Sequence, residues 1–300
     1  MIVSTRKHIS SDRIPYEYFQ GDPALVSCWP LSENGIDIAG SNNLTFTNII
    51  FTEGAARFNG TDSFGVTGGN VNLTSTNKIT VIADVKCTPY NITSLSSIIE
   101  SSVNPSVNNG SFAIIEGGTV AGDPLDIFIR GTGNVEFRYL LNKTPLADLN
   151  YHTIVLRGDF ALTTDEVSCV IDGISYIADS KASNTNNAGN FGTYPIYFGM
   201  RAGTSNPFNG LMKNVILSKR FIGVEELADY QAWKNDIRRN NSVSFSTVMG
   251  IPLDKRVPAS NYPKLVVNDS DGTGLVVADL SHGPDNNTIA EVRRMEKFNN

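Results

Sequence analysis

The sequence lacks the cysteine pattern of a disulfide-stabilised or zinc-binding domain. Its three cysteines, Cys28, Cys87 and Cys169, are odd in number and widely spaced, so they form neither a disulfide framework nor a metal-binding knuckle. We expect all three to be buried free thiols, as is common for cysteine outside such frameworks. A reducing compartment of synthesis agrees with this expectation.

Charge and long apolar runs are also sparse. The formal net charge is -6, which argues against general nucleic-acid binding because that function needs a basic surface. No apolar run approaches the roughly 20 residues that a membrane helix needs. The first residues contain no apolar stretch of signal-peptide length, so we expect neither a membrane span nor export by the usual route.

Residues with catalytic potential are few and scattered. The three histidines lie far apart, and His152 falls inside a predicted strand, where we expect a packed or hydrogen-bonded structural role. Glu100, Glu116 and Glu136 stand singly on separate predicted strands. We therefore expect no enzyme activity.

The sequence is instead rich in short strand patterns. In residues 78–86, Ile79, Val81, Ala83 and Val85 alternate with more polar residues, which predicts one buried strand face. About a dozen such segments follow one another at even spacing with turn residues between them, a pattern typical of a β-sandwich or jelly roll. No helix is predicted before Val224.

Turn signals divide these strands. Asp172-Gly173 is the best two-residue hairpin turn in the chain, and the Asn-Gly-Thr-Asp run at 59–62 predicts a hairpin or bulge between two short strands. Residues 208–218 predict a closing strand. A helix should start at Val224, because Glu225 and Glu226 would lie in its first turn.

The chain divides into three predicted parts. Residues 1–23 are a polar N-terminal arm with scattered aromatic residues, which is either a disordered tail or a segment that orders against a partner. Residues 24–239 form the sandwich. Residues 240–300 form a C-terminal extension of three or four short strands, an extended arm, or both.

The order of these motifs resembles the concanavalin A-like superfamily, specifically its laminin-G-like (pentraxin-like) jelly-roll domains. The matching stretches are LVSCWPLSENG, ARFNGTDSFGV, KITVIADVK, YHTIVLRGDF, VIDGISY and FNGLMKNVILSKRFIGVEELADY, spread over residues 24–234. The resemblance implies an all-β antiparallel sandwich with a short helix after its closing strand. Glucanases of this superfamily carry Glu-x-Asp-x-x-Glu on one strand, and no such run occurs here, which argues against a glycoside hydrolase.

Calcium is the cofactor that the resemblance implies. Calcium needs several oxygen ligands from loops, and the best candidates are Asp62 and the nearby Asn59. The alternative is that both side chains only shape the turn by binding backbone groups.

Carbohydrate binding is the other implied activity. It would use amides and aromatic rings on the two long polar loops, 101–110 and 180–192, unless these loops are merely solvated. The candidate residues are Asn108, Asn109, Asn187, Asn190, Phe191 and Tyr194.

These observations predict a non-catalytic, lectin-like module of a larger, oligomeric assembly. We expect a phage virion protein, such as a capsid decoration, fibre or tail component, made in the host cytoplasm. Its contacts with other virion proteins would use residues 1–23 and 240–300, and it would bind cell-surface glycans. The alternatives are an extracellular carbohydrate-binding or adhesion protein of a bacterium and a degenerate glycoside hydrolase.

Overall fold

The computed structural model describes residues 15–88, 95–104, 108–117, 125–132, 136–141, 145–178, 180–182, 188–240, 243–244, 265–269 and 275–278. The chain divides into two compact units, Arg13–Ala232 and a second one made of Met1–Asp12 and Trp233–Asn300. The larger, which we call the sandwich unit, is all-β and antiparallel, as the sequence predicts. No helix in the described part of the chain is long and apolar enough to cross a membrane.

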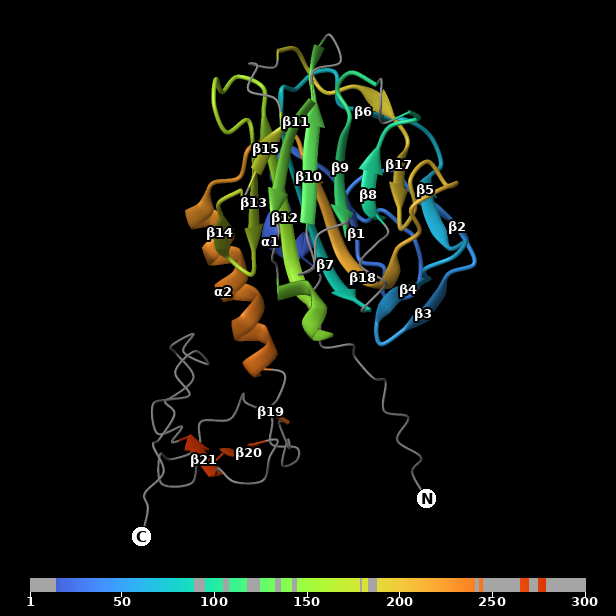
Figure 1. Ribbon diagram of the computed structural model, residues 1–300. Coiled ribbons are helices and arrows are strands. Elements are labelled where there is room, and N and C mark those ends of the chain that lie inside the picture. Colours follow the sequence, from blue (N-terminus) through green and yellow to red (C-terminus); the bar gives the residue numbers. More distant parts are fainter. Residues whose placement is uncertain are drawn as a thin grey trace. The chain divides into compact units, whose positions relative to one another are not determined.

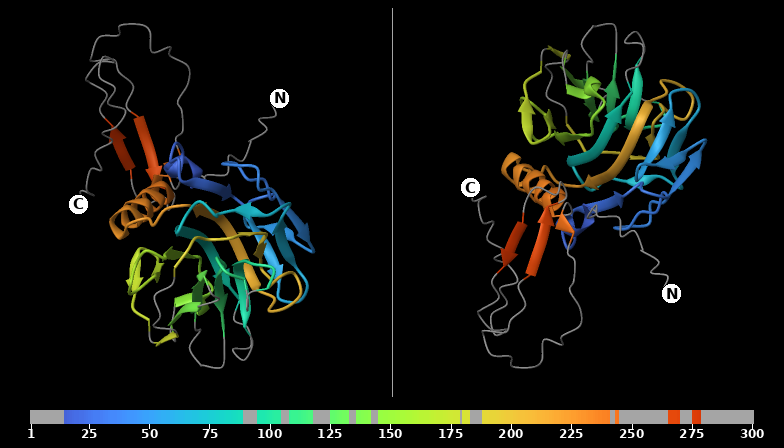
Figure 2. Two further views of the ribbon diagram at one scale, coloured as in Figure 1. Left: turned by 90° about the horizontal axis from the view of Figure 1, so that it is seen from above. Right: turned by 90° about the horizontal axis from the view of Figure 1, so that it is seen from below.

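Two eight-stranded sheets face each other in the sandwich unit (Figures 1 and 2). Sheet A has the order β14-β13-β12-β7-β18-β4-β3, and β1 also pairs with β18. Its strands are β1 (Leu25–Trp29), β3 (Ile50–Thr52), β4 (Ala55–Asn59), β7 (Lys78–Cys87), β12 (His152–Asp159), β13 (Val167–Ile171), β14 (Ile174–Tyr176) and β18 (Asn209–Ser218).

Sheet B has the order β15-β11-β10-β9-β8-β17-β5-β2. Its strands are β2 (Leu44–Thr47), β5 (Phe64–Thr67), β8 (Ser96–Ser101), β9 (Phe112–Glu116), β10 (Leu125–Arg130), β11 (Glu136–Leu141), β15 (Ser180–Ala182) and β17 (Ile196–Phe198). The edge strand β15 lies within the segment that was predicted as a loop from residue 180. A separate pair, β6 (Val71–Asn72) and β16 (Thr193–Tyr194), lies at one end of the sandwich, and η2 (Pro145–Asp148) precedes β12.

The core lies between the two sheets. The predicted inward face of β7 is confirmed, because Ile79, Val81, Ala83 and Val85 are all buried in one cluster with residues of sheet B. Burial of an aliphatic side chain of this kind stabilises a fold by about 1.5–3 kcal/mol. All three cysteines are buried and free, as expected.

Of the two predicted turns, one is confirmed and the other is wrong. Asp172 and Gly173 join β13 to β14 with φ values of 52° and 82°, as a two-residue hairpin turn of the expected kind requires. The hairpin expected at residues 59–62 is wrong. The strands on either side of this turn, β4 and β5, belong to different sheets, so the turn carries the chain across the core.

Two helices accompany the sandwich. The predicted helix α2 (Val224–Asn240) begins where the Leu227 amide donates to the Gly223 carbonyl, with Glu225 and Glu226 in its first turn. The one-turn helix α1 (Tyr16–Phe19) was not predicted, because four residues give no helical periodicity. Its Phe19 is buried, and the rings of Tyr18 and Phe19 contact Tyr230 of α2.

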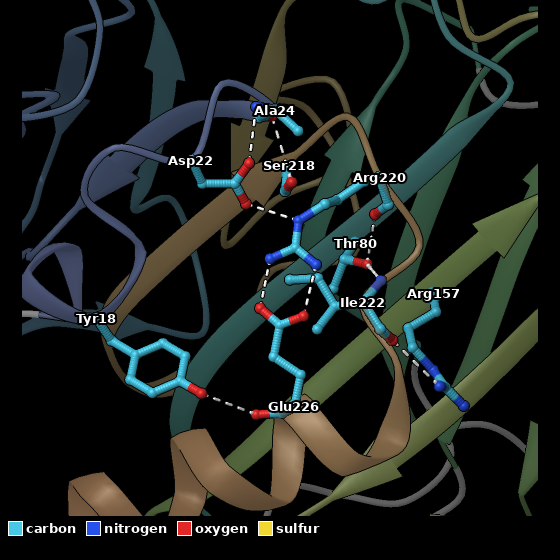
Figure 3. Close-up of polar contacts among 9 residues, drawn as sticks. All are labelled: Tyr18, Asp22, Ala24, Thr80, Arg157, Ser218, Arg220, Ile222 and Glu226. Atoms are coloured by element: carbon cyan, nitrogen blue, oxygen red, sulfur yellow. Dashed lines mark hydrogen bonds and ion pairs between the residues drawn. The ribbon is translucent and has the colours of Figure 1, made fainter.

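An ion cluster joins these pieces to the outer face of sheet A (Figure 3). The Arg220 guanidinium binds Asp22 with Nε–Oδ2 at 2.6 Å and Glu226 with Nη1–Oε2 at 2.6 Å. We call these three residues the Arg220 clamp. The Thr80 hydroxyl of β7 donates to the Arg220 carbonyl and accepts from the Ile222 amide. Described residues 15–23 of the predicted arm therefore pack on the sandwich.

In the second unit, the structure describes three short antiparallel strands, β19 (Val243–Ser244), β20 (Leu265–Asp269) and β21 (Leu275–Ala278). β20 and β21 fall where the sequence shows short apolar runs.

Candidate functional site

Three loop segments meet where β6 pairs with β16, at the upper end of the sandwich in Figure 1. The Leu73 amide donates to the Gly192 carbonyl at 3.0 Å, and the Gly192 amide donates to the Gly110 carbonyl at 3.0 Å. Segments 72–76, 108–111 and 189–194 are thereby joined through their backbones. We call the polar surface of this junction, formed by Asn72, Thr74, Asn109, Asn190, Thr193 and Tyr194, the amide rim.

Two glycines allow this close approach. Gly110 has φ +77°, and a Cβ on it would lie 2.3 Å from the Gly192 amide nitrogen. A Cβ on Gly192 would lie 2.2 Å from Cε2 of the Tyr194 ring. The junction therefore depends on the missing side chains at both positions.

Hydrogen bonds fix the rim side chains. The Tyr194 hydroxyl donates to the Asn109 carbonyl at 2.7 Å, and Nδ2 of Asn190 donates to the Thr74 carbonyl at 2.7 Å. The side-chain oxygen of Asn72 accepts from the Thr74 amide and from the hydroxyls of Thr74 and Thr193. Among the described residues, Nδ2 of Asn72 and Oδ1 of Asn190 have no hydrogen-bond partner, which leaves one donor and one acceptor on exposed side chains.

The structure brings three of the predicted sugar-binding residues together, namely Asn109, Asn190 and Tyr194, although 85 residues separate Asn109 from Tyr194. Asn108 has a local role, because its Oδ1 accepts from the amides of residues 103 and 104 and closes the loop. Asn187 lies outside the described residues.

Phe191 corrects the prediction. Its side chain is 1% exposed, and its ring stacks on Phe160 with centroids 4.5 Å apart. The ring belongs to the core and is not available as a sugar platform. The apolar neighbours that bury it come from distant strands, so the local sequence gave no sign of this.

Sequence reasoning did not assign Asn72, Thr74 and Thr193 to the site. The available signal was the Asn72-Leu73-Thr74 triplet, which forms an Asx turn here. Thr193 is placed only by its pairing with Asn72 across β6 and β16.

The side chains of the predicted calcium ligands form hydrogen bonds within the turn that joins the two sheets. Oδ1 of Asn59 accepts from the amides of Thr61 and Asp62 and from the Ser63 hydroxyl. The two carboxylate oxygens of Asp62 accept from the side-chain amides of Asn59 and Asn48, at 2.7 and 2.8 Å. Calcium takes about six to eight oxygen ligands, and this arrangement presents one carboxylate that is already occupied by donors. These residues therefore do not fit a calcium ion as they are arranged.

Two acidic side chains of sheet B, Glu100 and Glu136, are paired with arginines. Glu100 is fully buried and accepts from Nε of Arg201 at 2.9 Å and from the Ser102 hydroxyl at 2.6 Å. Glu136 forms an ion pair with Arg130. Across the residues that the structure describes, there is no group of three His, Cys, Asp or Glu side chains that could hold a metal ion.

His152 has the hydrogen-bonded role that the sequence predicts. Its Nδ1 lies 2.6 Å from Oδ2 of Asp172 and its Nε2 lies 2.8 Å from Oδ1 of Asp148. Burial lowers the pKa of the imidazole, but its bonds to Asp148 and Asp172 raise the pKa by more, so the net shift is upward. The pKa of Asp148 is lowered to about 2, first by its bond from Asn150 and then by His152. The contact ties η2 to the β13–β14 turn.

Comparison with known proteins gives no match to a family model and no match among curated sequences. Structural matches are found. The binding domain of botulinum neurotoxin serotype G has a TM-score of 0.55 and 12% identity, over 85% of this chain and 61% of that one. The receptor binding domain of the botulinum neurotoxin C/D mosaic serotype has a TM-score of 0.55 and 8% identity, over 90% and 63%.

A Trypanosoma rangeli sialidase, solved in complex with sialic acid, has a TM-score of 0.52 and 15% identity, over 71% of this chain and 33% of that one. The chain thus spans about three fifths of the toxin domains and one third of the sialidase. At these identities the likeness concerns the fold alone: the chain shares a β-sandwich architecture with binding domains of toxins and with part of a sialidase.

Proposed function

We propose that the sandwich unit is a non-catalytic glycan-binding module and that the amide rim is its binding surface. The observation that carries the proposal is the convergence of Asn109, Asn190 and Tyr194 from distant loops onto one exposed junction. Amides that orient a sugar by hydrogen bonds, next to an aromatic ring, are the groups that a polyhydroxylated ligand requires. The structural neighbours, which include receptor-binding toxin domains and a sialidase bound to sialic acid, support this class of function.

The pairing of Glu100 with Arg201 and of Glu136 with Arg130 favours binding without hydrolysis. A retaining or inverting glycosidase needs two carboxyl groups that face one sugar ring. The likeness to a sialidase keeps hydrolysis as the second candidate. Release of 4-methylumbelliferone from a panel of fluorogenic glycosides would support that candidate and overturn the non-catalytic proposal.

We also propose that the sandwich is a laminin-G-like member of the concanavalin A-like superfamily. The order of motifs along residues 24–234 supports this assignment. The two eight-stranded antiparallel sheets agree with it at the level of architecture.

The setting that we propose is a virion, with an extracellular bacterial adhesion protein as the alternative. The second compact unit supplies a region outside the sandwich that would contact neighbouring proteins. Described residues 15–23 pack on the sandwich, so the N-terminal contacts of this proposal are assigned to the residues before them. Sizing of the purified chain and negative-stain imaging test the assembly, and a stable monomer argues against it.

A glycan array tests the binding proposal directly. Wild-type protein is expected to bind a subset of glycans, and Tyr194→Ala is expected to lose that binding while its circular dichroism stays unchanged. Substitution of Tyr176, a half-buried residue of the edge strand β14 with a similar ring, serves as the matched control. Binding that survives Tyr194→Ala would place the ligand elsewhere.

A further inference from the structure

The absence of charged side chains from the amide rim narrows the class of ligand that the rim would bind. All six rim side chains are uncharged: two threonines, three asparagines and one tyrosine. Residues 63–77, 101–115 and 182–200 contain no Asp, Glu, Lys, Arg or His at all, although 18% of the chain is charged. The three segments that meet at the rim therefore all lack charged side chains.

Three described cations that adjoin these segments have other contacts. Nζ of Lys219 lies 3.3 Å from the Ser75 hydroxyl, and Nζ of Lys78 lies 3.3 Å from Oδ2 of Asp159. Arg130 accepts the Gly110 amide with its backbone carbonyl, but its guanidinium pairs with Glu136. Of these three cations, Lys78 and Arg130 are paired with carboxylates, whereas Lys219 contacts a neutral hydroxyl.

The groups that the rim does offer suit an uncharged polyol. The Asn72 side-chain NH2 is a donor and the Asn190 side-chain oxygen is an acceptor, and both side chains are exposed. Tyr194 pairs with the buried Val71, so its ring lies on the opposite face of the β6–β16 pair from Asn72, and it joins the rim through its hydroxyl at the Asn109 carbonyl. Sugar hydroxyls both donate and accept, whereas a carboxylate or sulfate only accepts and requires a cation or several donors.

We propose that the amide rim binds neutral sugars and discriminates against sialylated and other anionic glycans. The inference rests on the proposed glycan-binding function and specifies its ligand class. It separates this chain from the sialidase to which it is structurally similar, because that protein was solved with an acidic sugar. A carboxylate at the rim would lose hydration without gaining a counter-charge from any of the six rim side chains.

The test uses the full chain and pairs of immobilised oligosaccharides that differ only in a terminal sialic acid, with sulfated members as a further anionic class. Binding is expected for neutral members, with at least about tenfold weaker binding of their sialylated partners. Because no charge pair forms, the dissociation constant for a neutral member should change by less than about twofold between roughly 50 and 500 mM NaCl.

Two substitutions test whether neutral-sugar binding occurs at the amide rim. Asn72→Asp keeps the oxygen that accepts from Thr74 and Thr193 but replaces the outward donor with a negative charge, and it should weaken neutral-sugar binding about tenfold. Gln231→Glu adds the same charge beside Gly173, at the end of β12 opposite to the rim, and should leave affinity unchanged. Melting curves of both variants report whether the fold is kept.

The outcomes are distinguishable. Preference for sialylated members, or an affinity that falls steeply with salt, overturns the neutral-sugar inference and leaves the glycan-binding function standing. Silence toward every glycan overturns the proposed function itself. Neutral-sugar binding that Asn72→Asp and Tyr194→Ala both leave intact overturns the assignment to the rim.

Discussion

Arg220 and Glu226 form a bidentate ion pair, which joins the turn after β18 to the first turn of α2. The same guanidinium reaches Asp22, three residues after Phe19, the α1 residue whose ring contacts Tyr230. The bond from Glu226 and, after it, the bond from Asp22 hold the pKa of Arg220 above its usual value, against the effect of burial. The Arg220 side chain thus connects the N-terminal and C-terminal segments of the sandwich unit.

Replacing Arg220 should therefore destabilise the fold. Arg220→Met is expected to lower the free energy of unfolding by about 1–2 kcal/mol, since the pair is bidentate but partly exposed to solvent. Urea denaturation measures the change. Lys86→Met, which removes a partly exposed pair with Glu53 and a 5.9 Å cation–π contact with Tyr151, is the control and should cost no more than about 0.5 kcal/mol. Equal losses in the two variants would contradict a special role for the clamp.

The His152 contact should make stability depend on pH. The imidazole has a higher pKa in the folded chain than its ordinary value of 6.5, so its stabilising effect is complete below that value and is lost as pH rises through the folded pKa. Wild type should therefore exceed His152→Gln in unfolding free energy most clearly at mildly acidic pH. The gap should narrow toward alkaline pH. If the difference in unfolding free energy between wild type and His152→Gln stays constant from acidic to alkaline pH, the ring acts only through packing.

Gly192→Ala should disturb the amide rim from within. The added methyl group would meet the Tyr194 ring, so the ring must move, at a cost of about 1–3 kcal/mol in unfolding free energy. Binding of any neutral glycan that the wild type recognises should fall together with stability. Gly69→Ala is the matched control, because a Cβ there meets nothing within 4 Å. Unchanged binding in Gly192→Ala would contradict the role of Tyr194.

Calcium should have little effect on this chain. In the observed arrangement Asp62 accepts from Asn48 and Asn59, so titration with calcium should release no heat and leave the melting temperature unchanged. Asp62→Ala should destabilise the turn by about 1 kcal/mol through its lost hydrogen bonds. Heat in the wild type that disappears in Asp62→Ala would reverse this expectation and establish the metal site.

The three thiols should be inert in the folded state. Burial raises the pKa of Cys28 and of Cys169 to about 12, and the Asp37 charge adds to the effect at Cys28. Since the thiolate is the reactive form, Ellman's reagent should find no reactive thiol in native protein and three after denaturation. Rapid reaction of one thiol without denaturant would indicate a local opening.

Most of the fold prediction rested on the alternation of apolar and polar residues along the strands. In β7 the apolar face enters the core, as the pattern predicts, but Thr80, Ile82 and Asp84 on the other face are buried as well, which the alternation does not predict. The turn at 59–63 failed because a turn sequence specifies a reversal of the chain but not which sheet the next strand joins. The Asn59 side chain that binds residues 61–63 would stabilise either outcome.

The site was predictable only in part, for a similar reason. Composition pointed to the polar loops, and Asn109, Asn190 and Tyr194 do meet there. The contact itself depends on Gly110 and Gly192, whose backbones touch across 82 residues of sequence, and local patterns do not contain such pairings. Phe191 shows the converse: an aromatic residue in a polar loop is buried by strands far from it.

The position of β1 beside β18 has a mechanical consequence. Leu25 pairs with Ser218, so the chain enters and leaves this antiparallel ladder at the same end. A pull on the two flanking segments would load the ladder one hydrogen bond at a time, as in unzipping, rather than shearing all its bonds together. Asp22 and Glu226 lie just outside that end, and Arg220 bridges them. The Arg220 clamp is therefore the first contact to bear tension when the two flanking segments are pulled apart.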